Sequence, residues 1–259
     1  VNIAGPYGII ARNELARARD DFSPGYRCLL QFDQYMRYRD RAVAQKLDKC
    51  LTASTRKYND DAYMLATYAF AQSIFHRLNN PDAPYNSGME WATAAEQLNN
   101  ESAMANFAVA RAAFFEGNCS KGINWGEKAV ALNPLDSRIS GYLALYMTGC
   151  GYPDAESYAT LALQSDHNAD PVIAASLAFR KVEKGDNAGA RQMTEHYMAN
   201  ALRPEPSLQI VYILASVRLG ETDDARRVWR SLAQRFDLPE TVAPEKLLSK
   251  IIANPMVAR

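Results

Sequence analysis

Residues 103–136 read AMANFAVARAAFFEGNCSKGINWGEKAVALNPLD. A turn signal, Gly117-Asn118, divides this segment into two helix-forming halves, and Asn133-Pro134 closes it. Small residues stand at the positions where two paired helices would cross: Ala110, Gly122, Gly126 and Ala129. The segment therefore predicts a helical hairpin with a close crossing.

The hairpin pattern recurs along the chain. Further units begin at Ser137, Pro171 and Pro206. Their turn glycines, Gly117, Gly151, Gly185 and Gly220, are separated by 34, 34 and 35 residues. This period resembles that of the tetratricopeptide repeat (TPR), a helical hairpin of ~34 residues.

The pattern weakens upstream. Helices are expected over 61–78 and 87–98, joined by an enlarged loop at 79–84, and another hairpin over 25–40 and 42–54. Residues 244–252 read as an amphipathic helix that would cap the last repeat.

These elements predict an all-α fold, a TPR-type right-handed superhelix of about six helical hairpins with a C-terminal capping helix. We divide the chain into four parts: 1–22, which does not fit the repeat and would be left over from a preceding region; 23–100, divergent TPR-like hairpins; 101–240, four TPR units; and 241–259, the capping helix and tail.

The four cysteines suggest two pairings. Cys28 and Cys50 are level in the predicted first hairpin and lie on its shared apolar face, so a disulfide could join them, although two buried free thiols remain the alternative. Cys119 and Cys150 fall in turns of consecutive units, where a second bridge is compatible with stacking. Two bridges would favour an oxidising compartment, the periplasm or the cell exterior.

Composition narrows the class of partner. The 29 basic and 29 acidic side chains give a net charge of zero, which argues against nucleic-acid binding by this segment. No apolar run approaches the ~18 to 20 residues of a membrane span. Residue 1 is a valine rather than a methionine, which indicates a longer parent chain.

Catalytic patterns are missing from the sequence. It contains no Gly-rich phosphate loop, no His-Glu-x-x-His, no Cys-x-x-Cys and no Gly-x-Ser-x-Gly. The paired carboxylates at 20–21, 60–61 and 223–224 precede or open helices, where aspartate caps free amides. We therefore predict no enzyme activity, no catalytic residue, no cofactor and no metal site.

The first helix of each TPR hairpin lines a concave groove. The side chains expected to face it and bind a ligand are Met104, Phe107, Arg111, Phe114, Arg138, Leu145, Phe179, Ile210 and Leu214. Such a groove is largely apolar with two arginines, and it suits a protein segment, a peptide or a small amphipathic ligand with an anionic group. The alternative is that individual members pack against neighbouring units. The carboxylate clamp of chaperone-binding TPR domains is not matched, because its Lys and Asn positions hold Phe107, Arg111, Gly141 and Leu145.

Short runs at 6–10, 25–30, 50–51 and 129–134 (PYGII, GYRCLL, CL and AVALNP) add a second resemblance. The chain resembles the C-terminal half of bacterial membrane-anchored regulators, in which a winged-helix DNA-binding domain or an adenylate cyclase domain precedes a membrane span, a TolB-like α/β region and TPR repeats. The resemblance implies that residues 1–22 are the tail of the TolB-like region. It also implies that the repeats are periplasmic, with the membrane reached only through an upstream span.

The resulting hypothesis is an extracytoplasmic sensing or protein-interaction domain of a bacterial signalling or transcriptional regulator. It would bind its partner in the groove and transmit the result through superhelix shape or through formation of a homodimer. The alternative is a free-standing periplasmic TPR adaptor or assembly factor, which would lack an upstream output domain.

Overall fold

The computed structural model describes residues 9–17, 20–38, 41–79, 86–166, 169–199 and 204–247. Every regular element in these ranges is a helix, as the sequence predicted. The helices are α1 (Ile9–Arg17), α2 (Tyr26–Tyr38), α3 (Arg41–Lys57), α4 (Ala62–Asn79), α5 (Met89–Leu98), α6 (Ala103–Phe115), α7 (Cys119–Leu132), α8 (Ser137–Gly149), α9 (Ala155–Ser165), α10 (Pro171–Glu183), α11 (Asn187–Ala199), α12 (Pro206–Arg218) and α13 (Thr222–Arg235).

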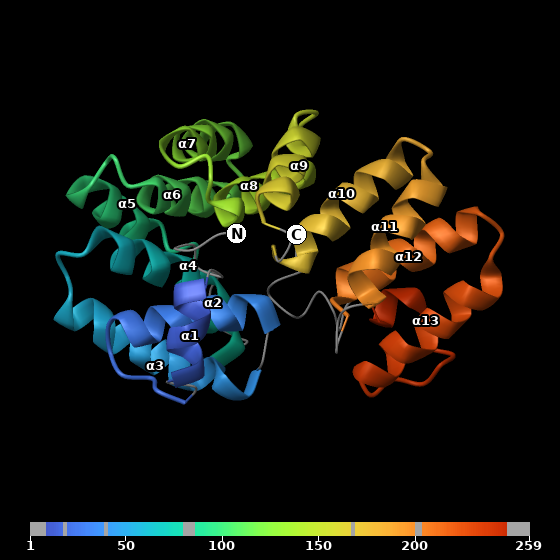
Figure 1. Cartoon of the computed structure of the whole chain (residues 1–259), viewed down its shortest axis with the longest axis horizontal. Coiled ribbons are helices and arrows are strands. Elements are labelled where there is room, and N and C mark those ends of the chain that lie inside the picture. Colours follow the sequence, from blue (N-terminus) through green and yellow to red (C-terminus); the bar gives the residue numbers. More distant parts are fainter. Residues whose placement is uncertain are drawn as a thin grey trace.

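From α4 onward the helices form a stack of antiparallel hairpins. Each helix packs on the next one in the chain, and each even-numbered helix from α4 to α10 also packs on the following even-numbered helix. The ribbon follows an arch, with α7 and α9 on its outer side and α6 and α8 below them (Figure 1). We call the even-numbered helices α4 to α12 the inner helices and the surface that they present the inner face.

Local sequence signals place the ends of the inner helices. Ser102 and Asp136 accept hydrogen bonds from the amides of Ala105 and Arg138, and so cap α6 and α8. Pro171 and Pro206 occupy the first positions of α10 and α12, where the missing amide hydrogen costs nothing. These caps explain why the hairpins restart at the positions that the sequence pattern indicated.

Four hairpin turns share one backbone conformation. The turn glycines at 117, 151, 185 and 220 have φ values of 81°, 70°, 86° and 81°. This left-handed conformation ends a helix and is adopted readily by glycine. The repeat period in the sequence thus corresponds to a repeated backbone geometry.

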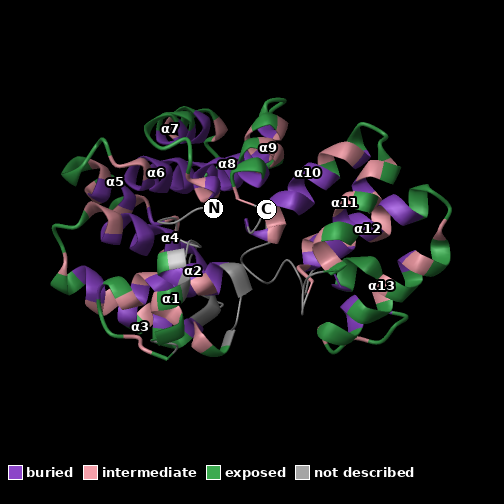
Figure 2. Cartoon of the chain, in the orientation of Figure 1, coloured by how far each residue is buried: buried purple, intermediate pink, exposed green. Residues whose placement is uncertain are grey.

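The core is largest toward the N-terminus. One continuous cluster of buried side chains runs from Cys28 to Ala155, whereas the helices after α8 share three smaller clusters. The helices α6 and α8 are buried over most of their length, whereas the outer helices α7 and α9 carry many exposed residues (Figure 2). Close crossings use glycine: a Cβ atom on Gly141 would stand 2.2 Å from Cδ1 of Ile173.

Two predicted terminal elements are seen in part. Residues 9–17 of the expected N-terminal remnant form α1, which packs on α2, and residues 1–8 lie outside the described residues. The expected capping helix is described as far as Leu247, which is buried together with Val242. Most of the predicted loop at 79–84 also lies outside the described residues.

The junction between α4 and α5 yields a prediction on stability. Gly88 has φ 79°, and a Cβ atom there would stand 2.2 Å from the carbonyl oxygen of Ala69. We expect Gly88→Ala to lower the free energy of unfolding by about 1–3 kcal/mol more than Gly117→Ala. The added methyl group would overlap the backbone of α4, and one of the two segments would have to move. Gly117 is the matched control: it has φ 81° but nothing within 4 Å of its Cβ position. Urea denaturation measures both, and equal losses would contradict the close approach.

Candidate functional site

The inner face is the surface on which the sequence placed a ligand groove. At its N-terminal end, the helix α2 covers it. Side chains of α2, α4, α6 and α8 enclose a cavity of about 20 Å³, room for one water molecule. The cavity is lined by Phe32, Asp33, Met36, Phe70, Met104, Phe107, Arg138, Ile139 and Tyr142. Met104 and Phe107, both expected to face an open groove, are therefore buried against the chain itself.

Arg138, a second predicted groove residue, lies at the centre of a charged cluster. Its Nη1 donates to Oδ1 of Asp33 in α2 at 2.7 Å, and its Nη2 donates to Oδ2 of Asp136 at 3.1 Å. Nη2 also donates to the hydroxyl of Tyr63 in α4 at 3.1 Å. The side chains of Arg138, Asp33 and Asp136 are 13%, 12% and 11% exposed. Two carboxylates thus share one guanidinium in a nearly buried site.

Burial and charge act unequally on the two carboxylates. Burial raises the pKa of Asp33 to about 6, because the attraction of Arg138 only partly offsets the lost hydration and Asp136 repels a second negative charge. Burial also acts on Asp136, but Arg138 and backbone amides bind its carboxylate, and its pKa falls below the usual value. Asp33 is therefore the member of the cluster that changes charge near pH 6.

Arg111 is held by aromatic rings and hydroxyl groups. Its guanidinium carbon lies 3.9 Å from the centre of the Phe70 ring and 4.3 Å from that of Phe115. Nε donates to the Tyr146 hydroxyl at 2.9 Å, and Nη1 donates to the Ser73 hydroxyl. Arg111 is 3% exposed, so it joins α4, α6 and α8 rather than standing in an open groove.

Phe114 faces its own hairpin. A Cβ atom on Gly122 of α7 would stand 2.7 Å from the Phe114 ring, which shows that the ring fills the space left by this glycine. The ring also lies 5.3 Å from that of Tyr146, centre to centre. Phe114 is buried, because the small residue that permits the helix crossing also accommodates the ring.

The predicted groove residues toward the C-terminus are more accessible. Phe179 in α10 is 38% exposed, and Leu145 and Leu214 are half-buried. Val217, one turn beyond Leu214 in α12, is 52% exposed. Ile210 packs instead against a cluster that includes Val242 and Leu247 of the C-terminal segment. The accessible apolar part of the inner face is therefore on α8, α10 and α12.

Arg218 adds a positive charge beside this part of the inner face. It ends α12, directly after Val217, and its Nη1 donates to the carbonyl oxygen of Val182 in α10 at 3.0 Å. None of the described carboxylates forms an ion pair with it. The exposed apolar residues of α10 and α12 are thus accompanied by an arginine that pairs with no carboxylate of the described ranges.

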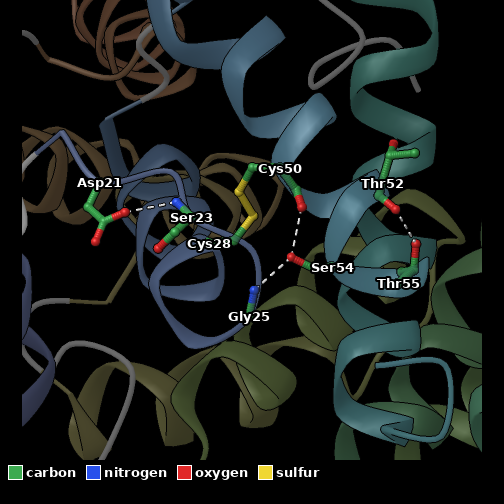
Figure 3. The surroundings of a disulfide bond; sticks show 8 residues. All are labelled: Asp21, Ser23, Gly25, Cys28, Cys50, Thr52, Ser54 and Thr55. Atoms are coloured by element: carbon green, nitrogen blue, oxygen red, sulfur yellow. Dashed lines mark hydrogen bonds between the residues drawn. A yellow bond between two sulfur atoms is a disulfide. The ribbon is translucent and has the colours of Figure 1, made fainter. Parts of the chain in front are cut away.

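The structure joins the cysteines in the two pairs considered from the sequence. Cys28 of α2 is bonded to Cys50 of α3 with their Cα atoms 6.0 Å apart (Figure 3). Beside this bridge, the Ser54 hydroxyl donates to the Cys50 carbonyl oxygen at 2.7 Å and accepts from the Gly25 amide at 2.9 Å (Figure 3). The start of α2 is thereby fixed to α3.

The second bridge crosses between hairpins. Cys119 begins α7 and Cys150 follows α8, and their Cα atoms are 6.1 Å apart. Both residues are half-buried, whereas Cys28 and Cys50 are in the core. The bridge therefore links consecutive repeats near the surface.

Sequence reasoning did not identify Asp33 and Tyr63, which complete the cluster around Arg138. One signal was available: Asp33 is a carboxylate in a stretch of α2 whose apolar residues Phe32 and Met36 are buried. An acid at such a position needs a partner, since burying it alone is costly.

Within the described ranges, no group of His, Cys, Asp and Glu side chains is arranged to hold a metal ion. Among the same residues, no helix combines the length and apolarity needed to cross a bilayer. The chain matches no protein-family model, and no curated protein matches it significantly.

Proposed function

We propose that this chain is a TPR-type right-handed superhelix that binds a partner protein or peptide on its inner face. It serves as the extracytoplasmic sensing or interaction domain of a bacterial signalling or transcriptional regulator. The repeated left-handed glycine turns and the packing of each inner helix on the next support the TPR assignment. The two bridges support an oxidising compartment such as the periplasm.

The exposed apolar surface of α10 and α12 carries the binding proposal. Phe179 and Val217 expose large apolar side chains on inner helices, and Arg218, which follows Val217, forms no ion pair with a carboxylate in the part of the chain that the structure describes. A partner segment with apolar side chains and a carboxylate would bury the first two and pair with the third. The helix α2 covers the N-terminal part of the inner face. The exposed surface of α10 and α12 is therefore the part that remains available for docking.

Photocrosslinking in cells tests this assignment. A benzoylphenylalanine replacing Phe179 in the full-length parent protein should crosslink a partner, and the same probe replacing Leu161 should not. Leu161 is the matched control, because it is exposed but lies on the outer helix α9.

A second substitution makes the test specific. We expect Val217→Asp to reduce the yield from the probe at Phe179 about tenfold, since a buried unpaired carboxylate costs more than ~1.4 kcal/mol. An unchanged melting temperature shows that the variant is folded. Equal crosslinking from both probe positions, or none from Phe179, would exclude the inner face as the binding site.

A further inference from the structure

The helix α2 is attached to the rest of the chain in two different ways. Its first turns are fixed covalently by the bridge from Cys28 to Cys50 and by the hydrogen bond of Gly25 to Ser54. Further along, its contacts with the inner face are non-covalent. Phe32 packs edge-on against Phe70, with ring centres 6.1 Å apart, and Asp33 forms the ion pair with Arg138. The later turns of α2, from Phe32 onward, could therefore separate from the inner face while the first turn stays in place.

The charges at this contact do not balance. When both carboxylates are ionised, Asp33, Asp136 and Arg138 together carry one net negative charge in a nearly buried site. Binding of one proton makes the cluster neutral, which suits a site with little water. Moving α2 away from α8 would return Asp33 to water, where an isolated carboxylate is well hydrated.

We propose that α2 is a pH-dependent cover of the inner face. Asp33 takes up a proton as α2 closes over Met104, Phe107 and Arg138, so acid holds the cover shut and neutral to alkaline pH loosens it. This inference goes beyond the proposed function, because it assigns the proton as a signal that controls access to the N-terminal half of the groove.

The direction of the effect follows from linkage. With the cover closed, the pKa of Asp33 is about 6, against 3.8 for a solvated aspartate. The closed form therefore binds more protons than the open form between about pH 4 and pH 6. Its advantage is complete below this range and is lost as the pH rises through about 6. The ion pair forms at neutral pH, yet the cover is weaker there, because ionised Asp33 must stay buried.

The groups that face Asp33 do not titrate in the same range. Arg138 and Asp136 face it from the start of α8, and Tyr63 faces it from α4. The pKa of Asp136 is lowered and that of Tyr63 is raised, so near pH 6 Asp136 stays ionised and Tyr63 stays neutral. Tyr142, which also lines the cavity, donates its hydroxyl hydrogen to Asp170 at 2.5 Å.

Hydrogen exchange read by mass spectrometry tests the cover without any partner. Protection factors are measured for the amides of α2 and, as an internal reference, of α12, at about pH 5 and about pH 7.5 after correction for the intrinsic exchange rate. We expect α2 protection, relative to α12, to fall about tenfold between the two pH values, which corresponds to one pKa unit. An equal change in both helices would indicate a global effect and would overturn the proposal.

Two variants assign the effect to one residue. Asp33→Asn keeps an oxygen that accepts from Arg138 but cannot ionise, so α2 protection should become independent of pH. Asp21→Asn, an exposed acid just before α2, should keep the tenfold change. A tenfold change retained in Asp33→Asn would overturn the assignment. If that variant does not fold, the comparison of α2 with α12 in the unmodified protein decides.

Discussion

Arg138→Met should lower the free energy of unfolding by about 3–5 kcal/mol, the loss typical of a buried ion pair that loses one partner. The guanidinium donates hydrogen bonds to Asp33, Asp136 and Tyr63. Its removal leaves two carboxylates in a nearly buried site without a cation. Urea denaturation at neutral pH measures the effect.

The matched control is Arg226→Met. Arg226 also pairs with an aspartate, Asp223, but its side chain is 70% exposed, so the change should stay within about 0.5 kcal/mol. Adding Asp33→Asn to Arg138→Met should recover at least about 1 kcal/mol, because one of the two unpaired carboxylates is removed. Equal losses in the two methionine variants would show that the cluster around Arg138 is not buried.

The double variant Cys28→Ala/Cys50→Ala should lose about 3 kcal/mol, because the unfolded chain gains the freedom that the bridge removes. The two cysteines are 22 residues apart. Both are also buried in the main core, so deletion of the sulfur atoms should add a small cavity cost. Urea denaturation under non-reducing conditions measures the sum.

Cys119→Ala/Cys150→Ala is the comparison that separates the two contributions. Its cysteines are 31 residues apart, so the chain-entropy contribution is about the same, but both are half-buried and leave less of a cavity. We expect it to lose somewhat less stability than Cys28→Ala/Cys50→Ala. Thiol titration of the unfolded, unreduced protein should find no free thiol, and four free thiols would contradict both bridges.

The helices could be predicted because their signals are local. The turn at Gly117 and the cap at Asn118 fix the ends of α6 and α7, and a left-handed glycine recurs one period later, at Gly151. Local patterns cannot give the angle at which the first hairpin meets the stack. That angle places Asp33 beside Arg138, 105 residues away, and covers Met104.

For the predicted groove residues, too, the sequence indicated the local placement but not the long-range packing. Their periodic positions on α6 predicted a common face, and Phe107 and Arg111 do point toward neighbouring inner helices. Whether such a face is open depends on what packs against it, and periodicity does not contain this information. At Phe179, where no described element covers the face to the same extent, the side chain remains partly exposed.

The placement of the two bridges has a mechanical consequence. Both lie in the first 150 residues, and no cysteine follows Cys150. The hairpins of a repeat stack contact mainly their neighbours, so a pulling force acts on them in series. Unfolding under tension can extend any helix outside the bridges, whereas the chain between Cys28 and Cys50 and between Cys119 and Cys150 stays closed. We therefore expect an applied force to extend α4 to α6 and α9 to α13 before it can extend the two segments that the bridges close, 28–50 and 119–150.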